Sequence, residues 1–418
     1  MFRTSFTQTL YLHKDTLPRV LLGVTVVSFI IIMITHPKII FAGSVAGLNA
    51  WWNIVFPALL PFFIASELLM SFGIVHFMGV LLEPVMRPLF NVPGTGSFVM
   101  AIGFTSGYPI GSMVTARLRS QGLCSRVEAE RLMSFTNNSS PLFMLVAVAV
   151  GMFNNPAVGL VIAGAHYTAN LTLGLGLRFY GRSEKEKSTQ PRTKIHLIPA
   201  KALAEMLGIV RQENRPFGKI MGDAVKNSIN NLLNIGGFII LFAVIINVLT
   251  ELGVIGLIAA ALGKILIPVG VSASVLSAVA SGLFEMTMGT KLASEASAPL
   301  LQQLVAVSFI LAWSGLSVIA QVASMIAHTD IRLGLFIAAR IFHAFLAGMY
   351  TVVFYNLFEP KINTSTVFNA YNQTGLGTTL IFIKNSLLLF FGILAVFIVI
   401  SLLACLAVNV FRIFARKM

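Results

Sequence analysis

The stretch SFTNNSSPLF (134–143) places four consecutive small polar side chains and a proline inside sequence that is otherwise strongly apolar. The two asparagines and two serines at 137–140 form hydrogen bonds readily, and Pro141 has no backbone N–H with which to continue a helix. Hydrophobic residues flank the stretch on both sides. This pattern predicts an apolar helix that is interrupted at a polar centre, in a protein whose surroundings are themselves apolar.

The composition indicates a membrane protein. The chain has 418 residues, of which 56% are hydrophobic and only 11% are charged, whereas about 25% of an ordinary globular protein is charged. The net charge of +14 fits the Lys and Arg that collect in cytoplasmic loops, and no interleaved aromatic and basic pattern indicates a nucleic-acid partner. The two cysteines lie in unlike contexts and indicate neither a disulfide framework nor a Cys-based metal site.

Apolar runs long enough to cross a bilayer recur along the chain. A helix needs roughly 20 apolar residues to span the hydrocarbon core. The basic N-terminus leads into an apolar run without a small-residue cleavage site, which favours a first membrane helix over a signal peptide. The expected crossings are about 19–35, 50–72, 132–152, 155–178, 229–250, 304–327, 331–357 and 379–410.

Two stretches rich in Gly, Ser and Pro are too interrupted to be simple crossings. Each of them, 91–111 and 268–289, reads as two short helices that meet at a turn. Irregular backbone is tolerated at membrane depth only where it is buried in protein or lines a cavity. We therefore expect two re-entrant helical hairpins.

Charge assigns the sides of the membrane. The stretch 178–226 holds eleven Lys and Arg and is the expected cytoplasmic loop, and 117–131 adds four arginines on the same side. The loop 358–378 has a single lysine and is placed outside. Following the crossings from a cytoplasmic N-terminus reproduces these placements and ends with a cytoplasmic C-terminus.

Three segments recur in the same order in the second half of the chain. The matched pairs are 72–89 with 252–269, 106–118 with 281–293, and 134–145 with 308–319. The topology orients the two copies oppositely, so the expected fold is an all-α polytopic membrane protein with inverted repeats, re-entrant hairpins and broken helices. Inverted repeats are typical of secondary transporters, which bind substrate between the repeats. The predicted domains are an N-terminal membrane helix (1–49), a first repeat (50–178), a basic cytoplasmic loop (179–227), a second, inverted repeat (228–357), and an extracytoplasmic loop with a C-terminal membrane helix (358–418).

The crossing after each hairpin is interrupted, at TNNSSP (136–141) and at AWSGLS (312–317). A helix break exposes N–H and C=O groups, and the positive end of a half-helix can bind an anion. The alternative is that these polar groups only join helices to one another. The candidate ligand-binding residues at the breaks, the hairpin tips and the last crossing are Ser106, Gly107, Tyr108, Asn137, Asn138, Ser139, Ser140, Ser281, Gly282, Glu285, Ser314, Ser317 and Arg340.

Ionisable residues at membrane depth are costly and point to function. Glu285, in the second hairpin, could bind a coupling cation, carry a proton or pair with a cationic group. Arg340 suits a carboxylate ligand, because its planar fork binds such groups through two hydrogen bonds. The alternative for Arg340 is a structural ion pair with Glu67 or Glu285. His166 and His343 are expected to be hydrogen-bonded residues of the helix bundle.

No enzyme motif is present. The chain has no phosphate-binding Gly-Lys-Ser/Thr loop, no HExxH zinc pair and no GxSxG elbow. We therefore expect a protein without enzymatic activity and without a cofactor. Transport would be coupled to a proton or a sodium ion, or driven by the substrate gradient alone.

Three segments resemble the sporulation integral membrane protein family known as YlbJ or SpoVV. They are FPALLPFFIASELLMSFG (56–73), GFTSGYPIGSMVTARL (103–118) and SFTNNSSPLFML (134–145). The resemblance extends over nearly the whole chain and implies a nucleoside-transporter-like gate domain, with gate repeats that correspond to the two repeats above. It also implies a multi-pass protein that exports dipicolinic acid from the mother cell across the outer forespore membrane during sporulation. Gate-domain relatives indicate a homo-oligomer.

The implied substrate is a small, flat, aromatic dicarboxylate. Arg340 would supply a counter-charge and Tyr108 would cover the ring, whereas Glu285 would repel a dianion unless a proton or a cation neutralised it. Two alternatives stay open. One is a transporter of nucleosides or other metabolites on the same fold, and the other is a non-transporting scaffold for spore cortex assembly.

Overall fold

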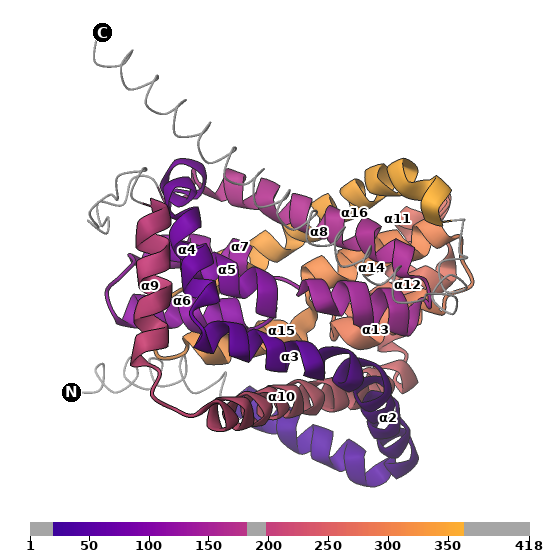
Figure 1. The fold of residues 1–418 in the computed structure, drawn as a ribbon. Helices are drawn as coiled ribbons and strands as arrows, with labels where there is room; N and C mark the ends of the chain where they lie inside the picture. The colour runs from indigo at the N-terminus through magenta and orange to yellow at the C-terminus, as the bar shows by residue number, and fades with distance from the viewer. Residues whose placement is uncertain (1–19, 182–197, 363–418) are drawn as a thin grey trace, which may run out of the picture.

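The computed structural model describes residues 20–181 and 198–362, and these two ranges are helical, with no strand. Figure 1 shows the helices gathered into one bundle. Five of the described helices are long and apolar enough to cross a membrane, by length and composition. They are Pro37–Ser71, Pro156–Leu177, Phe217–Glu251, Leu300–Ile326 and Leu333–Phe358.

The helices form two sets in the same order: a long helix, a shorter helix, a hairpin, a broken helix and a final helix. The first set is α2 (Pro37–Ala50) with η1 (Trp51–Val55) and α3 (Phe56–Ser71), α4 (Ile74–Val85) with η2 (Met86–Phe90), α5 (Gly96–Ser106), α6 (Ile110–Ser120), α7 (Arg126–Thr136), η3 (Phe143–Met152) and α8 (Pro156–Leu177). The second set is α10 (Phe217–Glu251), α11 (Val254–Leu266) with η5 (Ile267–Val269), α12 (Ala273–Gly282), α13 (Met286–Ser294), α14 (Leu300–Trp313), α15 (Gly315–Ile326) and α16 (Leu333–Ile362).

The long helices that open the two sets run antiparallel. At one end, a Cβ added to Gly43 of α2 would lie 2.9 Å from the Cα of Val244 in α10. At the other end, the amide of Asn227 in α10 donates a 3.1 Å hydrogen bond to Glu67 of α3. Residue numbers thus rise along one helix and fall along its partner. The two sets are oriented oppositely, as expected for inverted repeats.

Contacts between the repeats are reciprocal. Helix α6 packs on α15, and its counterpart α13 packs on η3. Helix α7 packs on α16, and its counterpart α14 packs on α8. Figure 1 shows hairpin α5–α6 and hairpin α12–α13 on opposite sides of the bundle. The expected fold class is therefore confirmed: inverted repeats with hairpins and broken helices.

Several boundaries differ from the sequence predictions: α10 begins at Phe217 rather than near residue 229, and the hairpin helices extend to Ser120 and Ser294 rather than to residues 111 and 289. The first long helix begins at Pro37 rather than near residue 50, because proline fits the first turn of a helix and apolar sequence follows it without a break. The polar stretch expected as a cytoplasmic loop contains α9 (Ile198–Gln212), which packs on α4. Ile198 and Ala202, one turn apart, form its buried face.

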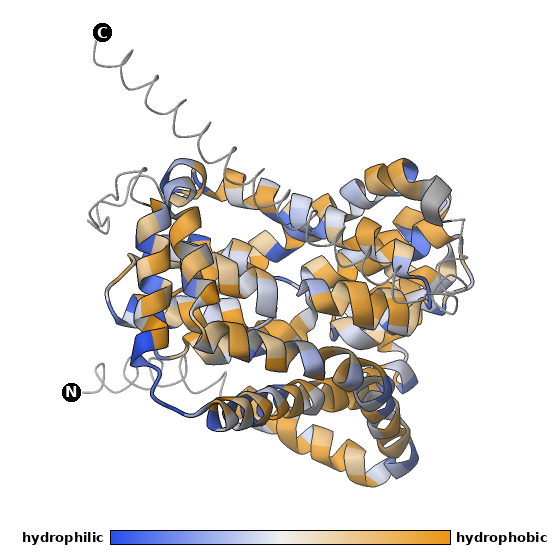
Figure 2. Ribbon diagram, viewed as in Figure 1, coloured by the Kyte–Doolittle hydropathy of each residue, from blue (hydrophilic) through white to orange (hydrophobic). Residues whose placement is uncertain are grey.

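The hydropathy of the helices agrees with a bundle in a bilayer. Figure 2 shows apolar residues along most helices, whereas hydrophilic residues gather at the turn between α9 and α10. In that turn Arg215 pairs with Glu213 at 2.5 Å and with Asp223 at 2.6 Å. The expected C-terminal helix, about 379–410, lies outside the described residues.

Candidate functional site

The tip of the first hairpin lies against the break in the next helix. Helix α5 ends at Ser106, and Gly107 takes a φ of +79°, a conformation that glycine adopts without a steric penalty. A Cβ on Gly107 would lie 2.9 Å from the backbone N of Ser140. The glycine thus permits both the reversal of the chain and the close approach of the hairpin tip to the break.

The first break spans the four residues between Thr136, where α7 ends, and Pro141. The hydroxyl of Ser140 accepts a 3.1 Å hydrogen bond from the backbone N–H of Phe143 and so caps the second half of the helix. The backbone N–H of Ser139 donates to Nε2 of His166, at 3.3 Å. The predicted interruption at 137–140 is therefore present.

The second break is shorter and is held by its own hairpin. Ser314 and Gly315 both have positive φ, at +74° and +82°, and α15 begins at once. The N–H groups of Leu316 and Ser317 donate 2.9 Å hydrogen bonds to the carbonyls of Leu283 and Phe284 at the tip of the second hairpin. The expectation that the first amides of α15 are free to bind an anion is therefore wrong, because hairpin carbonyls occupy them.

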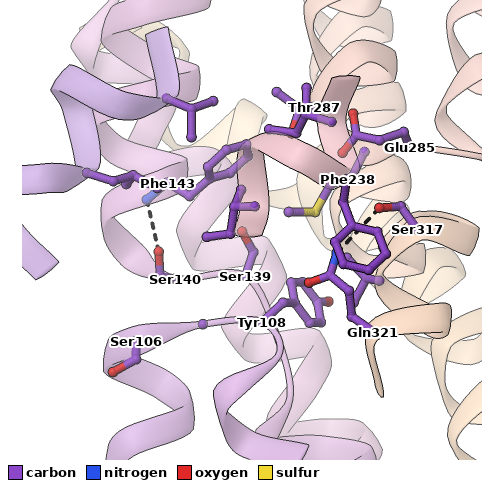
Figure 3. Close-up of a pocket in the computed structure, with 17 residues that line it drawn as sticks. Ser106, Tyr108, Ser139, Ser140, Phe143, Phe238, Glu285, Thr287, Ser317 and Gln321 are labelled. Atoms are coloured by element: carbon purple, nitrogen blue, oxygen red, sulfur yellow. Dashed lines mark hydrogen bonds between the residues drawn. The ribbon is translucent and has the colours of Figure 1, made fainter. Parts of the chain in front are cut away.

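Both hairpin tips, the first break and the start of α15 border one cavity, closed on a further side by apolar residues of α3 and α10 (Figure 3). The cavity holds about 520 Å³ of space between atoms, including its open mouth. Seven of the sequence candidates line it: Ser106, Gly107, Tyr108, Ser139, Ser140, Glu285 and Ser317. In Figure 3 the hydroxyl of Ser106 points away from the other labelled side chains.

The other six candidates lie behind the lining. Asn137, Asn138 and Ser314 belong to the breaks themselves, but they and Arg340 are each 0% exposed and do not line the cavity. Ser281 and Gly282 belong to the packing of the second hairpin, where a Cβ on Gly282 would lie 2.6 Å from Ile310. The structure thus brings the tips and breaks together but does not place these six side chains at the cavity surface.

Several lining residues were not among the candidates. The most polar is Gln321, whose amide lies 3.4 Å from the hydroxyl of Ser317, one turn earlier on α15. That spacing could have predicted it, because residues four apart share a helix face. Thr287 follows Glu285 at the hairpin tip, and Phe143 and Phe238 supply aromatic rings. Phe238 lies in an apolar helix and carried no signal in the sequence.

Among the described residues that line the cavity, Glu285 is the only charged one. It is 2% exposed and caps α13, accepting a 2.7 Å hydrogen bond from the backbone N–H of Met288. A carboxylate is favoured at a helix N-terminus by the free N–H groups and by the helix dipole. The second hairpin therefore places a titratable carboxyl group in the cavity wall.

The buried arginine and histidines lie together beneath the first break. Nη1 of Arg340 lies 3.1 Å from Nδ1 of His343, and Nε2 of His343 lies 2.9 Å from the carbonyl of His166. Within residues 20–181 and 198–362, Arg340 forms no ion pair with Glu67 or Glu285, so that alternative is not realised. Over the same ranges no three His, Cys, Asp or Glu side chains gather closely enough to hold a metal ion.

Part of the chain matches a protein-family model, and most of the chain is similar to solved structures of a protein named CNTnw. The family model Gate, described as nucleoside recognition, matches residues 53–168. Among solved structures, the chain is similar to CNTnw in an inward-facing substrate-bound state, with a TM-score of 0.48 and 14% identity over 86% of this chain and 87% of that one. A doubly substituted variant of CNTnw in an outward-facing state gives a TM-score of 0.45 and 13% identity over 85% of this chain and 86% of that one.

Curated relatives give a closer match. An uncharacterized protein, BpOF4_10220 of Alkalihalophilus pseudofirmus, is 30% identical over 97 residues, which is 22% of this chain and 21% of that protein. Sporulation integral membrane protein YlbJ of Bacillus subtilis is 45% identical over 359 residues, covering 84% of this chain and 86% of that protein. The resemblance found in the sequence is confirmed, and this chain belongs to the YlbJ family of sporulation integral membrane proteins.

Proposed function

We propose that this protein is a secondary-type transporter of a small organic anion, and that the anion is dipicolinic acid, exported from the mother cell across the outer forespore membrane during sporulation. The observation that carries the proposal is the cavity where the two hairpin tips, the first break and the first turn of α15 meet, with hydroxyl, amide and carboxyl groups among its apolar lining. Such a site can open to either side when one repeat moves against the other. Membership of a sporulation membrane protein family supports the biological setting.

The cavity surface has the chemistry to bind a small aromatic acid. Hydroxyl groups of Ser139, Ser140 and Ser317 and the amide of Gln321 can donate hydrogen bonds to carboxylate oxygens. The rings of Tyr108 and Phe143 lie in the same wall and offer flat apolar contact to an aromatic ring (Figure 3). Polar donors beside aromatic faces are the usual composition of small-molecule sites.

Glu285 sets a condition on this proposal. Its carboxylate would repel a dianion bound in the same cavity. We therefore include a coupling ion in the proposal: a proton on Glu285, or a sodium ion beside it, neutralises the wall while the substrate is bound. No bond of the substrate is made or broken, so the proposed protein is not an enzyme.

A second candidate substrate class is favoured by a specific observation. The matching family model is described as nucleoside recognition, and Glu285 with Gln321 could bind the hydroxyl and amide groups of a neutral nucleoside without any coupling ion. A third possibility, a scaffold for spore cortex assembly, needs no cavity at all. It predicts that alanine at the cavity surface changes nothing.

Transport into proteoliposomes tests the proposal. The purified full-length protein would be reconstituted, and uptake of radiolabelled dipicolinate measured with no gradient, with a proton gradient and with a sodium gradient. We expect wild-type uptake above empty vesicles, and at least a tenfold loss in Ser140→Ala. Ser274→Ala, which removes an exposed serine bonded to the carbonyl of Ser297 outside the cavity, is the control and should transport normally.

Each alternative gives a different result in the same assay. Uptake of uridine instead of dipicolinate would favour the nucleoside hypothesis. Absence of any uptake under all three conditions, together with normal sporulation of a Ser140→Ala strain, would contradict transport and favour the scaffold.

A further inference from the structure

Arg340 is wholly buried and joins the two repeats. It lies in α16 of the second repeat, yet its hydrogen-bond partners outside its own helix belong to the first. Nη1 donates to the carbonyl of Asn137 and to the hydroxyl of Tyr108, both at 3.1 Å, and Nη2 donates to the carbonyl of Ser134. The guanidinium carbon also lies 5.3 Å from the ring centre of Phe336.

These contacts satisfy the open end of α7. The last carbonyls of any helix lack donors within the helix, and together they carry partial negative charge. In α7 the carbonyl of Phe135 accepts from the amide of Asn170, while those of Ser134 and Asn137 accept from Arg340. The positive charge of Arg340 is thus compensated by a helix terminus, in a place where a buried charge without partners would be very unfavourable.

Two side chains of α8 also hold this break: Tyr167 donates a 3.0 Å hydrogen bond to the carbonyl of Ser139, and His166 occupies the position equivalent to Arg340 in the first repeat. His166 lies 32 residues after Ser134, and Arg340 lies 32 residues after Ser308, the serines that open the matched segments. Both side chains reach the first break, His166 through the N–H of Ser139 and Arg340 through the carbonyl of Asn137. The break between α14 and α15 is instead held mainly by the carbonyls of its own hairpin.

We infer that Arg340 is a positioning residue of the cavity: it fixes the end of α7 and, through Tyr108, the tip of the first hairpin, and thereby sets the placement of Ser139 and Ser140. It acts from behind the lining and is not the counter-charge of the substrate. This inference rests on the proposed function for its consequence in transport, but its structural content does not depend on which substrate is carried.

Thiol labelling tests the placement without any substrate. The background is the full-length chain with Cys124→Ala and Cys405→Ala, and the reporters are Asn137→Cys and Ser140→Cys, labelled with a small maleimide in membranes. With Arg340 present, we expect position 140 to react and position 137, which is 0% exposed, to be protected. Arg340→Gln should raise the labelling rate at 137 at least tenfold.

Two further variants keep the result interpretable. Tyr350→Phe removes a 3.1 Å contact between α16 and α8, to Thr172, and should leave labelling at 137 unchanged. Arg340→Lys keeps the charge but lacks the fork that reaches three partners, so it should give an intermediate rate even if Arg340→Gln does not fold. Labelling at 137 equal to the parent in Arg340→Lys and in any folded Arg340→Gln would overturn the inference.

A transport arm separates this inference from the proposed function. A positioning role predicts that Arg340→Lys lowers affinity for dipicolinate and for its uncharged diamide by the same factor. Loss of dipicolinate transport with unchanged labelling at 137 would make Arg340 a direct counter-charge and overturn the inference. If the parent protein moves no dipicolinate, the proposed function fails, while the labelling rates still decide the role of Arg340.

Discussion

The two helix breaks are held in place by different groups. The second break is a single residue, Ser314, between α14 and α15, and the first turn of α15 is bonded to the backbone of its own hairpin. The first break is four residues long and depends on side chains of α8 and α16. Hairpin and break therefore form one unit in the second repeat, whereas in the first repeat the break is held partly by α8 of the same repeat and partly by α16 of the other.

This difference bears on alternating access. A movement of α16 relative to the first repeat would change the support of the first break directly, because Arg340 travels with α16. The same movement would leave the bonds from Leu316 and Ser317 to their hairpin in place. We therefore expect the first break to be the adjustable wall of the cavity and the second break to be the rigid one.

The largest effect should come from Gly315→Ala, which adds a methyl group at the second, rigid break. Gly315 has a φ of +82°, and a Cβ there would lie 3.0 Å from the carbonyl oxygen of Phe284. The left-handed conformation costs an alanine roughly 1–2 kcal/mol, and displacement of the hairpin would weaken two hydrogen bonds of about 1 kcal/mol each. We expect a loss of about 4 kcal/mol in the free energy of unfolding, measured by denaturant unfolding in micelles.

Gly270→Ala is the matched control for that experiment. Gly270 has a φ of +92°, but a Cβ there would meet nothing within 4 Å. Only the backbone penalty of roughly 1–2 kcal/mol should remain. Equal losses in the two variants would show that the contact between the second break and its hairpin contributes nothing.

The next largest effect should come from Arg332→Gln, which removes a contact between α7, the helix before the first break, and the residues just before α16. Arg332 precedes α16 and donates to Glu130 of α7 at 2.7 and 3.0 Å. The side chain of Glu130 is 0% exposed, and removal of the Arg332 guanidinium leaves this buried carboxylate with the hydroxyl of Tyr180, one backbone N–H and Arg126 at 3.9 Å, which compensate its charge less well. We expect a loss of about 3 kcal/mol in the free energy of unfolding and faster labelling of Asn137→Cys.

The control lies at the base of the other hairpin. Lys291 and Glu295 approach to 4.0 Å, with side chains 29% and 58% exposed. Exposed pairs of this kind contribute about 0–1 kcal/mol, so Lys291→Gln should have little effect on unfolding. A Lys291→Gln loss as large as that of Arg332→Gln would contradict the asymmetric support of the two repeats.

Both breaks and both hairpins could be predicted from the sequence, because clusters of Gly, Pro, Ser and Asn within an apolar run indicate an interrupted helix. The sequence could not predict which amides are already bonded. Leu316 and Ser317 donate to hairpin carbonyls that lie more than 30 residues away in the chain, and no side-chain pattern encodes that contact. The partner of Arg340 could not be predicted for a related reason. A buried guanidinium can bind a carboxylate ligand, a carboxylate side chain or a helix terminus, and the sequence does not distinguish among these partners.

A third prediction concerns the hairpin tips, of which the first is uncharged and the second carries Glu285. Glu285→Gln keeps an oxygen that can accept from the N–H of Met288 but removes the negative charge from the cavity wall. Repulsion of a dianion should fall, and we expect dipicolinate to bind about tenfold more tightly, which corresponds to about 1.4 kcal/mol. Uptake should also lose its dependence on proton or sodium gradients.

Glu67→Gln is the control for charge removal away from the cavity. Glu67 lies on α3 and accepts a hydrogen bond from Asn227. It should transport with unchanged gradient dependence. If Glu285→Gln keeps the gradient dependence of the wild type, the coupling ion does not act at this carboxylate.

The smallest effect should come from Asp330→Asn, which removes an exposed link between the repeats. Arg119 at the end of α6 donates two 2.8 Å hydrogen bonds to Asp330, and these bonds hold the pKa of that carboxyl below its usual value. A lowered pKa means that the pair stabilises the fold above about pH 4, and that this stability is lost as the pH falls through the lowered pKa. The side chain of Asp330 is 50% exposed, so we expect only about 0.5 kcal/mol at pH 7.

Thermal unfolding of the wild type and of Asp330→Asn at pH 7 and at pH 3 measures this contribution. The difference in Tm should be small at pH 7, smaller in 1 M salt because an exposed pair is screened, and smallest at pH 3. A difference that grows toward pH 3 would have the wrong sign for a carboxylate stabilised by Arg119. A large difference at pH 7 would mean that the first repeat depends on this exposed pair as strongly as on the buried bonds of Glu130 and Arg340.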